Sequence, residues 1–287
     1  MSLGDKLDEK SLGKKLQSAR QHAGLTQQAM CQQAGLSYST LAKIERGAIK
    51  APSIFTVKQI ADVLSVSLDE LLGGLNNNVN KKRTKSGVTF IYFDINGCLV
   101  RFYHRAFTAI AKDTGLSPDA IETYFWQYND AICTGKMSIS EFNIAFAQDL
   151  GIPSIDWQSY YLNAVNPITE MHELVQWASK NYRIGLLSNI GSGFIEDMKK
   201  VGLLPNVNYD AIVDSSKVGT IKPDPGIYQT AEAMAGVPSN EILLIDDTRS
   251  NLIPAQKAGW HVMWFNDYDC IESTERVRLA LEIDPDQ

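Results

Sequence analysis

The sequence contains a small set of carboxylate, hydroxyl and ammonium side chains that together could transfer a phosphoryl group. A carboxylate can attack phosphorus and carry the phosphoryl group covalently. Neighbouring carboxylates can hold Mg²⁺ through hard oxygen ligands, and a lysine with a hydroxyl can stabilise charge on the transferring oxygens. Each side chain alone would be weak evidence, but they follow one another in an order that suits this chemistry. They are Asp94, Ser188, Lys222, Asp246 and Asp247.

Most of these side chains stand where predicted strands end. Val88–Phe93, Ile184–Leu187 and Ile242–Ile245 are short apolar runs, and each is followed directly by one of the polar groups. The runs Ala211–Val213 and Val262–Phe265 have the same character, and helical stretches separate all of them. This alternation predicts an α/β domain with a parallel sheet. Because ligands bind outside the carboxyl ends of parallel strands, we expect the polar groups to converge on one crevice.

The interval between Asp94 and Ser188 predicts an inserted lid. The two residues are 94 positions apart, whereas a simple crossover unit needs only about 30 residues. The excess, about residues 104–170, has the character of helices with aromatic side chains. We therefore expect a separate helical cap over the crevice.

Together these motifs resemble the haloacid dehalogenase superfamily. Within it, they resemble the branch whose helical cap follows the first motif, which here contains Asp94. The resemblance covers about residues 88–267, and segments 135–142 and 222–228 are most similar to the small sugar-phosphate phosphatases of that branch. It implies a nucleophile, a phosphate-binding hydroxyl, a charge-stabilising lysine and a pair of magnesium carboxylates. In this sequence these are Asp94, Ser188, Lys222, Asp246 and Asp247. We expect Asn189 to bind substrate together with the hydroxyl and the lysine.

Asn96 departs from the family pattern. Phosphatases of the family usually carry aspartate two residues after the nucleophile, as general acid and base. The backbone carbonyl of Asn96 can still bind Mg²⁺, as the family uses it, but its amide cannot deliver a proton, and losing such a group costs about 10²–10⁴-fold in rate. Three outcomes stay open: cleavage of anomeric or acyl phosphates, whose leaving groups need little protonation; use of another acid or a water; or binding of a phosphorylated ligand with little turnover, as in a sensor.

Charge divides the chain unevenly. The formal net charge is −6, yet residues 1–85 hold 13 Lys and Arg against 7 Asp and Glu, while residues 86–287 hold 14 against 26. A basic module that binds polyanions, joined to a larger acidic body, would give this division. A chance distribution of surface charge would also give this division, so the motifs must decide between the two explanations.

Short helices without strand-like alternation are predicted before residue 73. Serine and threonine mark the starts of successive helices, and glycines mark their ends. A helix from Gln27 to about Gln33 is joined through Gly35 to the next one, which predicts a helix-turn-helix in an all-α domain of five small helices. The predicted N-caps after the first helix are Thr26, Ser37, Ser53 and Ser67.

The later helix of this pair would offer its outer face to DNA. Its apolar residues Leu41 and Ile44 must face the core, so the opposite face carries Ser39, Lys43 and Arg46. Hydrogen-bonding and cationic side chains at this spacing suit the base edges and phosphates of a major groove.

Several of these segments resemble the phage-repressor (Cro-like) helix-turn-helix family. The match covers roughly residues 11–73 and includes segments 25–28 and 35–41. It implies binding of double-stranded DNA, with a structural ion pair between Arg20 and Glu45, whose charges would otherwise be costly on inward helix faces. The DNA-contacting residues that it implies are Gln27, Tyr38, Ser39, Thr40 and Lys43. A module kept for dimerisation or protein contact is the alternative.

A stretch rich in glycine, asparagine and basic residues separates the two parts of the chain. We therefore expect a helix-turn-helix domain over residues 1–73, an exposed linker over 74–87 and a hydrolase-like α/β domain over 88–287. The basic run Lys81-Lys82-Arg83 is interpreted as part of the solvated linker, with contact to DNA phosphates as the alternative.

Cysteine usage and hydropathy predict a cytoplasmic protein. The cysteines have no C-x-x-C spacing and the first ten residues carry no export signal, so we expect free thiols in a reducing compartment. The longest apolar stretches are about six residues, too short for a membrane span. On DNA we expect a homodimer on a two-fold operator.

The motifs support three hypotheses for function. In the first hypothesis, the chain is a Mg²⁺-dependent phosphohydrolase that is joined to a DNA-binding domain and acts on a small phosphorylated metabolite. In the second, it is a transcription regulator whose hydrolase-like domain senses such a metabolite. In the third hypothesis it is an interaction protein with neither activity. The joint presence of Asp94, Ser188, Lys222 and Asp247 favours the first hypothesis, and Asn96 favours the second.

Overall fold

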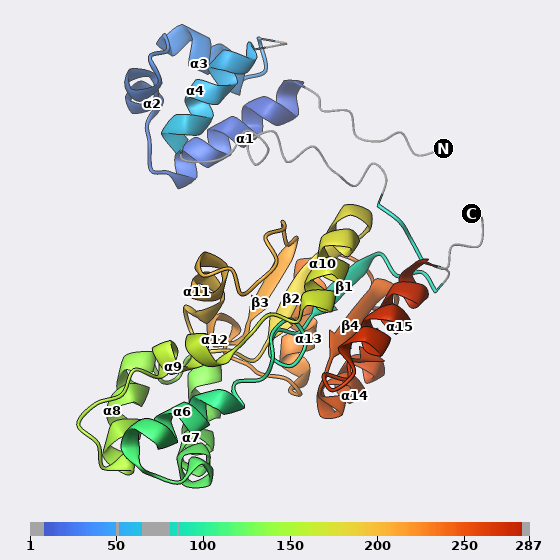
Figure 1. Cartoon of the computed structure of the whole chain (residues 1–287). Helices are drawn as coiled ribbons and strands as arrows, with labels where there is room; N and C mark the ends of the chain where they lie inside the picture. The colour runs from blue at the N-terminus through green and yellow to red at the C-terminus, as the bar shows by residue number, and fades with distance from the viewer. Residues whose placement is uncertain (1–8, 50–51, 65–80, 85, 283–287) are drawn as a thin grey trace. The chain divides into compact units, whose positions relative to one another are not determined.

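The chain divides into two units, Met1–Val79 and Asn80–Gln287, and each has a hydrophobic core of its own (Figure 1). The computed structural model describes residues 9–49, 52–64, 81–84 and 86–282. Within these ranges, no helix is long and apolar enough to span a membrane.

The first unit is built from short helices. They are α1 (Glu9–His22), α2 (Gln27–Ala34), α3 (Tyr38–Glu45) and α4 (Ile54–Leu64). The side chain of Thr26 caps α2 by accepting a hydrogen bond from the backbone N–H of Ala29, and Ser37 caps α3 by accepting one from Thr40. These caps confirm the predicted helix-turn-helix. The helix predicted to begin at Ser67 lies outside the described residues.

A buried ion pair joins α1 to α3. Nε of Arg20 lies 2.7 Å from Oε1 of Glu45, and Nη2 lies 3.1 Å from Oε2. The guanidinium also donates to the backbone carbonyl of Leu25. Both side chains are buried, where an unpaired charge would be strongly destabilising. The predicted structural ion pair is thus present.

A parallel five-stranded sheet forms the centre of the second unit. The strands are β1 (Phe90–Phe93), β2 (Arg183–Ser188), β3 (Ala211–Asp214), β4 (Ile242–Asp246) and β5 (His261–Trp264). They lie in the order β3-β2-β1-β4-β5, with every neighbouring pair parallel. Phe93 pairs with Leu186 of β2 and with Ile245 of β4, so these strands end at almost the same level. The predicted parallel α/β fold is confirmed.

Helices cover both faces of the sheet. They are α10 (Thr169–Asn181), α11 (Phe194–Lys200), α12 (Ser215–Val218), α13 (Pro225–Ala235), the 3₁₀ helix η2 (Ser239–Glu241), α14 (Arg249–Lys257) and α15 (Cys270–Glu282). In β1, Ile91 and Phe93 join one buried cluster with α10, α11 and α15, while Phe90 and Tyr92 join another with α13 and α14. Burial on both faces explains why the strands are continuous apolar runs.

The inserted helices form a group beside this layered body (Figure 1). They are α6 (His104–Thr114), α7 (Pro118–Cys133), α8 (Ile139–Leu150) and α9 (Trp157–Ala164). Aromatic rings fill their interior: the ring centroids of Phe125 and Trp157 are 4.5 Å apart, and those of Phe107 and Trp157 are 5.6 Å apart. After α9, Val100 bridges to Pro167 and the chain returns to the body. The cap helices therefore end slightly before the predicted residue 170.

The end of the predicted linker is attached to the second unit. Nζ of Lys81 donates to the backbone carbonyls of Ser179 at 2.5 Å and Tyr182 at 2.7 Å, at the carboxyl end of α10. Nη2 of Arg83 lies 2.8 Å from Oε1 of Glu241. The expectation of a solvated basic run is therefore wrong for Lys81, because carbonyls at the end of a helix need donors and attract cations, whereas Arg83 is exposed. The earlier linker residues lie outside the described ranges.

Candidate functional site

The polar side chains at the ends of β1 and β4 come together with the lysine that precedes α13. Nζ of Lys222 lies 3.0 Å from Oδ1 of Asp94 and 2.5 Å from Oδ2 of Asp246. One carboxylate oxygen each of Asp94, Asp246 and Asp247 lies within 4.8 Å of the others. Residues that are far apart in the sequence thus lie together at the carboxyl edge of the sheet, where the strand ends predict one crevice.

Asp246 is held by protein donors on both of its oxygens. It is fully buried. Oδ1 accepts hydrogen bonds from the backbone N–H of Thr248 at 2.8 Å and from Nδ2 of Asn251 at 3.1 Å, while Oδ2 faces Lys222. The carboxylate therefore fixes the position of the lysine.

Asn189 also holds Lys222. Its Oδ1 accepts from the backbone N–H of Lys222 at 2.7 Å, and its Nδ2 donates to the Lys222 carbonyl at 2.8 Å. The side chain was expected to bind substrate, but its amide is already occupied by this backbone. Sequence reasoning could not foresee the pairing, because the two residues are 33 positions apart and on different elements.

Two buried oxygens at the carboxyl ends of β1 and β2 have few partners in the protein. Ser188 ends β2 and is 1% exposed, and its Oγ has no hydrogen-bond partner among the described residues. Oδ1 of Asp94 is buried likewise and has only the ion pair with Lys222. Because an unsatisfied buried polar atom costs free energy, the Ser188 hydroxyl at the end of β2 indicates the place of a polar ligand.

A glycine allows the chain to approach Asp247 closely. Gly97 has a φ of 82°, in the left-handed region that favours glycine. A Cβ at this position would lie 2.2 Å from Oδ2 of Asp247. Any side chain here would therefore displace the Asp247 carboxylate from the loop that follows β1.

The crevice carries more negative than positive charge. Burial, and then the charges of the neighbouring carboxylates, raise the pKa of Asp247 to about 7. Burial also raises the pKa of Asp94 to about 6, although the charge of Lys222 opposes this shift. Burial acts to lower the pKa of Lys222, but the charges of Asp246 and Asp94 prevail and raise it above its usual value. The lysine is thus charged, and a further cation would relieve the repulsion between the carboxylates.

The outer face of α3 in the first unit is open to solvent. Tyr38 is 58% exposed, and Ser39, Lys43 and Arg46 are exposed with it. Thr40 is half-buried, and its hydroxyl lies 2.8 Å from the N-cap hydroxyl of α3. Five of the side chains predicted to contact DNA therefore belong to one helix and the residue that follows it.

The amide of Gln27 is not part of this exposed face. Its Nε2 donates to Oε2 of Glu45 at 2.7 Å, so the amide completes the buried network with Arg20. The Nε2 of Gln27 therefore has a partner inside the unit, and contact of Gln27 with DNA stays a prediction.

Comparison with known families decides the identity of the larger unit. The haloacid dehalogenase-like hydrolase family matches residues 91–265, more than half of the chain. The chain belongs to this family.

The first unit is a helix-turn-helix domain. The helix-turn-helix family matches residues 16–71. An uncharacterized HTH-type transcriptional regulator of Bacillus subtilis, YazB, is 39% identical over 59 residues, which are 21% of this chain and 84% of that protein. The chain thus joins a DNA-binding type of domain to a haloacid dehalogenase-like hydrolase domain.

Solved structures share the haloacid dehalogenase-like fold. A variant of an enzyme of this family from Bacteroides thetaiotaomicron, in complex with magnesium and inorganic phosphate, aligns with a TM-score of 0.52 at 16% identity, over 63% of this chain and 95% of that chain. A predicted hydrolase of the family from Porphyromonas gingivalis aligns with a TM-score of 0.51 at 22% identity, over 67% and 98%. At these identities the likeness shows the fold alone.

Asn96 of the haloacid dehalogenase-like domain is tied to the cap. Its Oδ1 accepts a hydrogen bond of 2.6 Å from the hydroxyl of Tyr161 in α9. Asn96 is 9% exposed and Tyr161 is 3% exposed. The amide therefore turns its oxygen to the cap.

A small cavity lies between the cap and the body of the haloacid dehalogenase-like domain. Its volume is about 20 Å³, enough for about one water molecule. Asn96 and Asn189 line it from the body, and Phe125, Asn129 and Trp157 line it from the cap. Asn96 lies two residues after Asp94, and Asn189 directly follows Ser188. The cavity that they line is therefore beside the predicted phosphoryl position.

Sequence analysis missed Asn129 and Tyr161. Phe125, Asn129 and Cys133 are spaced by four residues on α7 and therefore share a face, a signal that the sequence did contain. Tyr161 offered no such signal, because its partner Asn96 is 65 positions away and the contact depends on how the cap docks.

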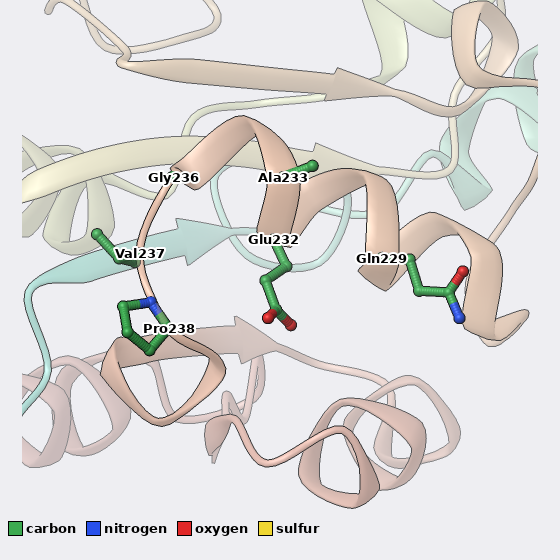
Figure 2. A pocket seen from close by; sticks show the side chains of 6 residues that line it. All are labelled: Gln229, Glu232, Ala233, Gly236, Val237 and Pro238. Atoms are coloured by element: carbon green, nitrogen blue, oxygen red, sulfur yellow. The ribbon is translucent and has the colours of Figure 1, made fainter.

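A wider hollow of about 510 Å³ lies elsewhere on the hydrolase domain, along α13 and the loop after it (Figure 2). Gln229, Glu232 and Pro238 are among the residues that line it. Oε2 of Glu232 accepts a hydrogen bond from Nε1 of Trp260. The hollow contains none of the predicted site residues and offers no converging set of polar groups.

Proposed function

We propose that the protein is a Mg²⁺-dependent phosphohydrolase joined to a DNA-binding domain, and that it acts on a small phosphorylated metabolite through an aspartyl-phosphate at Asp94. The observation that carries this proposal is the buried Oγ of Ser188, which has no hydrogen-bond partner among the described residues, together with Oδ1 of Asp94, which pairs with the charged Nζ of Lys222 at 3.0 Å. An attacking oxygen, a hydroxyl donor and a fixed cation are the groups that phosphoryl transfer needs.

The proposed reaction has two displacements. In the first, a carboxylate oxygen of Asp94 attacks phosphorus, the bond from phosphorus to the leaving-group oxygen breaks, and the electron pair leaves with that oxygen. Ser188 donates its hydroxyl hydrogen to one phosphoryl oxygen, and Lys222 stabilises negative charge on another. In the second, a water attacks the aspartyl-phosphate. One of its protons stays on the released phosphate, the other goes to solvent, and Asp94 becomes a carboxylate again.

The acidic cluster fits a magnesium ion. The pKa values of Asp94 and Asp247 are both raised, because burial and repulsion between neighbouring carboxylates penalise the charged forms. A hard dication with oxygen ligands would relieve both the burial penalty and the repulsion. Asp94, Asp247 and the backbone carbonyl of Asn96 would hold it, while Asp246, whose oxygens already have protein donors, contributes its charge. The ion would neutralise phosphoryl charge during transfer. The Bacteroides thetaiotaomicron enzyme with the same fold was solved with magnesium and inorganic phosphate.

Asn96 limits which leaving groups can depart. Its amide cannot give a proton to an alkoxide, so alcohol leaving groups depart slowly. An acyl phosphate releases a carboxylate, which needs no proton. We therefore expect turnover of acyl or anomeric phosphates to exceed that of ordinary phosphate monoesters.

A sensor is the second candidate function, and Asn96 is the observation that favours it. If turnover is slow, the hydrolase domain would spend most of its time with a phosphorylated ligand bound. Release of inorganic phosphate from a panel of small phosphorylated compounds, with and without Mg²⁺, tests the choice. Phosphate release that depends on Asp94 supports the enzyme, and tight binding without release supports the sensor.

The helix-turn-helix domain is proposed to bind a two-fold operator as a homodimer, with α3 in the major groove. The exposed face formed by Tyr38, Ser39, Lys43 and Arg46 supports this assignment. Phosphate contacts of this kind make binding steeply dependent on salt.

Removal of the two cationic side chains of this face is expected to weaken DNA binding. Each lost contact costs about 1–3 kcal/mol, so the Lys43→Ala/Arg46→Ala double variant should bind its operator at least about 10-fold more weakly at low salt. The measurement is fluorescence anisotropy on a duplex selected from random sequences. Lys58→Ala is the matched control, because Lys58 is exposed on α4 and pairs with Asp62. Equal binding by the double variant and the parent would exclude α3 as the recognition helix.

A further inference from the structure

The wall of the cavity between cap and body carries no formal charge. Among the described residues that line it, none is Asp, Glu, Lys, Arg or His. The polar members are amides, phenols and a thiol, and the others are aromatic rings or aliphatic groups. Whatever part of a substrate lies beside its phosphoryl group therefore meets hydrogen-bonding and apolar groups only.

The groups of this wall that can titrate stay neutral. Burial, and then the charges of Asp130 and Asp214, raise the pKa of the Cys133 thiol to about 12. Burial also raises the pKa of Tyr103 above the usual tyrosine value. Near neutral pH, none of these side chains can supply a charge to balance an ion in the cavity.

The nearby cation is already balanced. Lys222 lies between the carboxylates of Asp94 and Asp246, and it faces the phosphoryl position. A second anionic group in the cavity would lose water and find no counter-charge among the described residues that line it. Leaving a buried charge without a partner is strongly unfavourable.

Asn129 is placed to bind a hydroxyl. It lies on α7 at the cavity wall and is half-buried. Its Oδ1 accepts a weak hydrogen bond from Sγ of Cys133 at 3.6 Å, and its Nδ2 is 3.5 Å from Oδ1 of Asp130. Each contact uses one of the two donors or one of the two acceptor positions of the amide, so a donor and an acceptor remain for a ligand.

We propose that the cap selects phosphorylated substrates that carry no charge beyond the phosphoryl group, and that Asn129 is a specificity-determining residue for them. The inference rests on the proposed phosphohydrolase function. A hydroxyl or a small apolar group fits this wall, whereas a carboxylate or a second phosphate is rejected.

A matched pair of probes tests the selection. Hydroxyethyl phosphate and phosphoglycolate have similar carbon skeletons, but the first ends in a hydroxyl and the second in a carboxylate. The full chain with Mg²⁺ should show a kcat/KM at least about 10²-fold higher for hydroxyethyl phosphate, the ratio that an unpaired buried charge implies. Equal use of the two probes, or preference for phosphoglycolate, would overturn the inference.

A cation placed in the wall should reverse part of this preference. Asn129→Lys is expected to shift the ratio of kcat/KM toward phosphoglycolate by at least about 10-fold, because the introduced ammonium pairs with the carboxylate. Gln127→Lys is the control, since it puts the same charge on the exposed side of α7. An equal shift in both variants would show a general effect of charge and would contradict the role of Asn129.

Acetyl phosphate separates this inference from the function on which it rests. It is small, uncharged beyond its phosphoryl group and needs no proton at its leaving group. If acetyl phosphate is cleaved but the two matched probes are used equally, only the selection by the cap is wrong. If none of the three compounds releases phosphate, the proposed function is wrong and the inference falls with it.

Discussion

Replacement of Asp94 by asparagine is expected to lower Mg²⁺-dependent phosphate release to background, a loss of at least about 10³-fold. Asparagine has the same shape, so the packing at the end of β1 should persist, but its amide oxygen cannot form the aspartyl-phosphate. Lys222 keeps its ion pair with Asp246, which preserves the rest of the crevice. The measurement is release of inorganic phosphate from acetyl phosphate by Asp94→Asn and by the parent, with and without Mg²⁺.

Asp224→Asn is the matched control for this variant. Asp224 is exposed and caps α13 by accepting a hydrogen bond from the backbone N–H of Gly226, a role that asparagine also fills well. The control should retain the full rate of phosphate release. If Asp94→Asn retained it as well, the activity would belong to another group or to a contaminant.

Asn96→Asp is expected to raise turnover of alcohol phosphates by about 10²–10⁴-fold, because the introduced carboxyl group can deliver a proton to the leaving oxygen. Tyr161 already donates to Oδ1 of Asn96. The same bond to one oxygen of the new carboxyl group would leave the other oxygen for the substrate. The gain should appear with hydroxyethyl phosphate and be much smaller with acetyl phosphate, whose leaving group needs no proton.

Acetyl phosphate is therefore the internal control for Asn96→Asp. A similar gain with both substrates would show that the variant acts through folding or access and not through proton transfer. No gain with either substrate, together with tight ligand binding, would favour the sensor. Because the Asn96-Gly97 pair is prone to deamidation, a peptide mass spectrum of the parent must show the intact amide.

The sequence was sufficient to predict the sheet and the convergence of its polar ends. The apolar runs that became β1, β2 and β4 are buried on both faces, so each is continuous and ends sharply at a polar residue. A parallel sheet puts Asp94, Ser188 and Asp246 at one edge, and the order β2-β1-β4 makes them neighbours there. The fixed topology explains why motifs that are distant in the sequence could be assigned to one crevice.

Side-chain partners could not be predicted in the same way. Asn189 and Gln27 were expected to face a ligand, yet their amides bond to Lys222 and to Glu45. The positions of Asn189 and Gln27 in the sequence do not reveal the hydrogen-bond partners of their amides, because each partner lies on another element. Lys81 likewise looked solvated, and only the position of the carboxyl end of α10 decided its contacts.

The most direct test is a crystal structure of the full chain grown with Mg²⁺ and beryllium fluoride, which mimics a phosphoryl group on a carboxylate. We expect the fluoride group on Asp94, with Oγ of Ser188 and Nζ of Lys222 against its fluorine atoms. The metal should lie beside Asp94 and Asp247. A fluoride group bound elsewhere, or a Ser188 hydroxyl that still has no partner, would contradict the phosphoryl site.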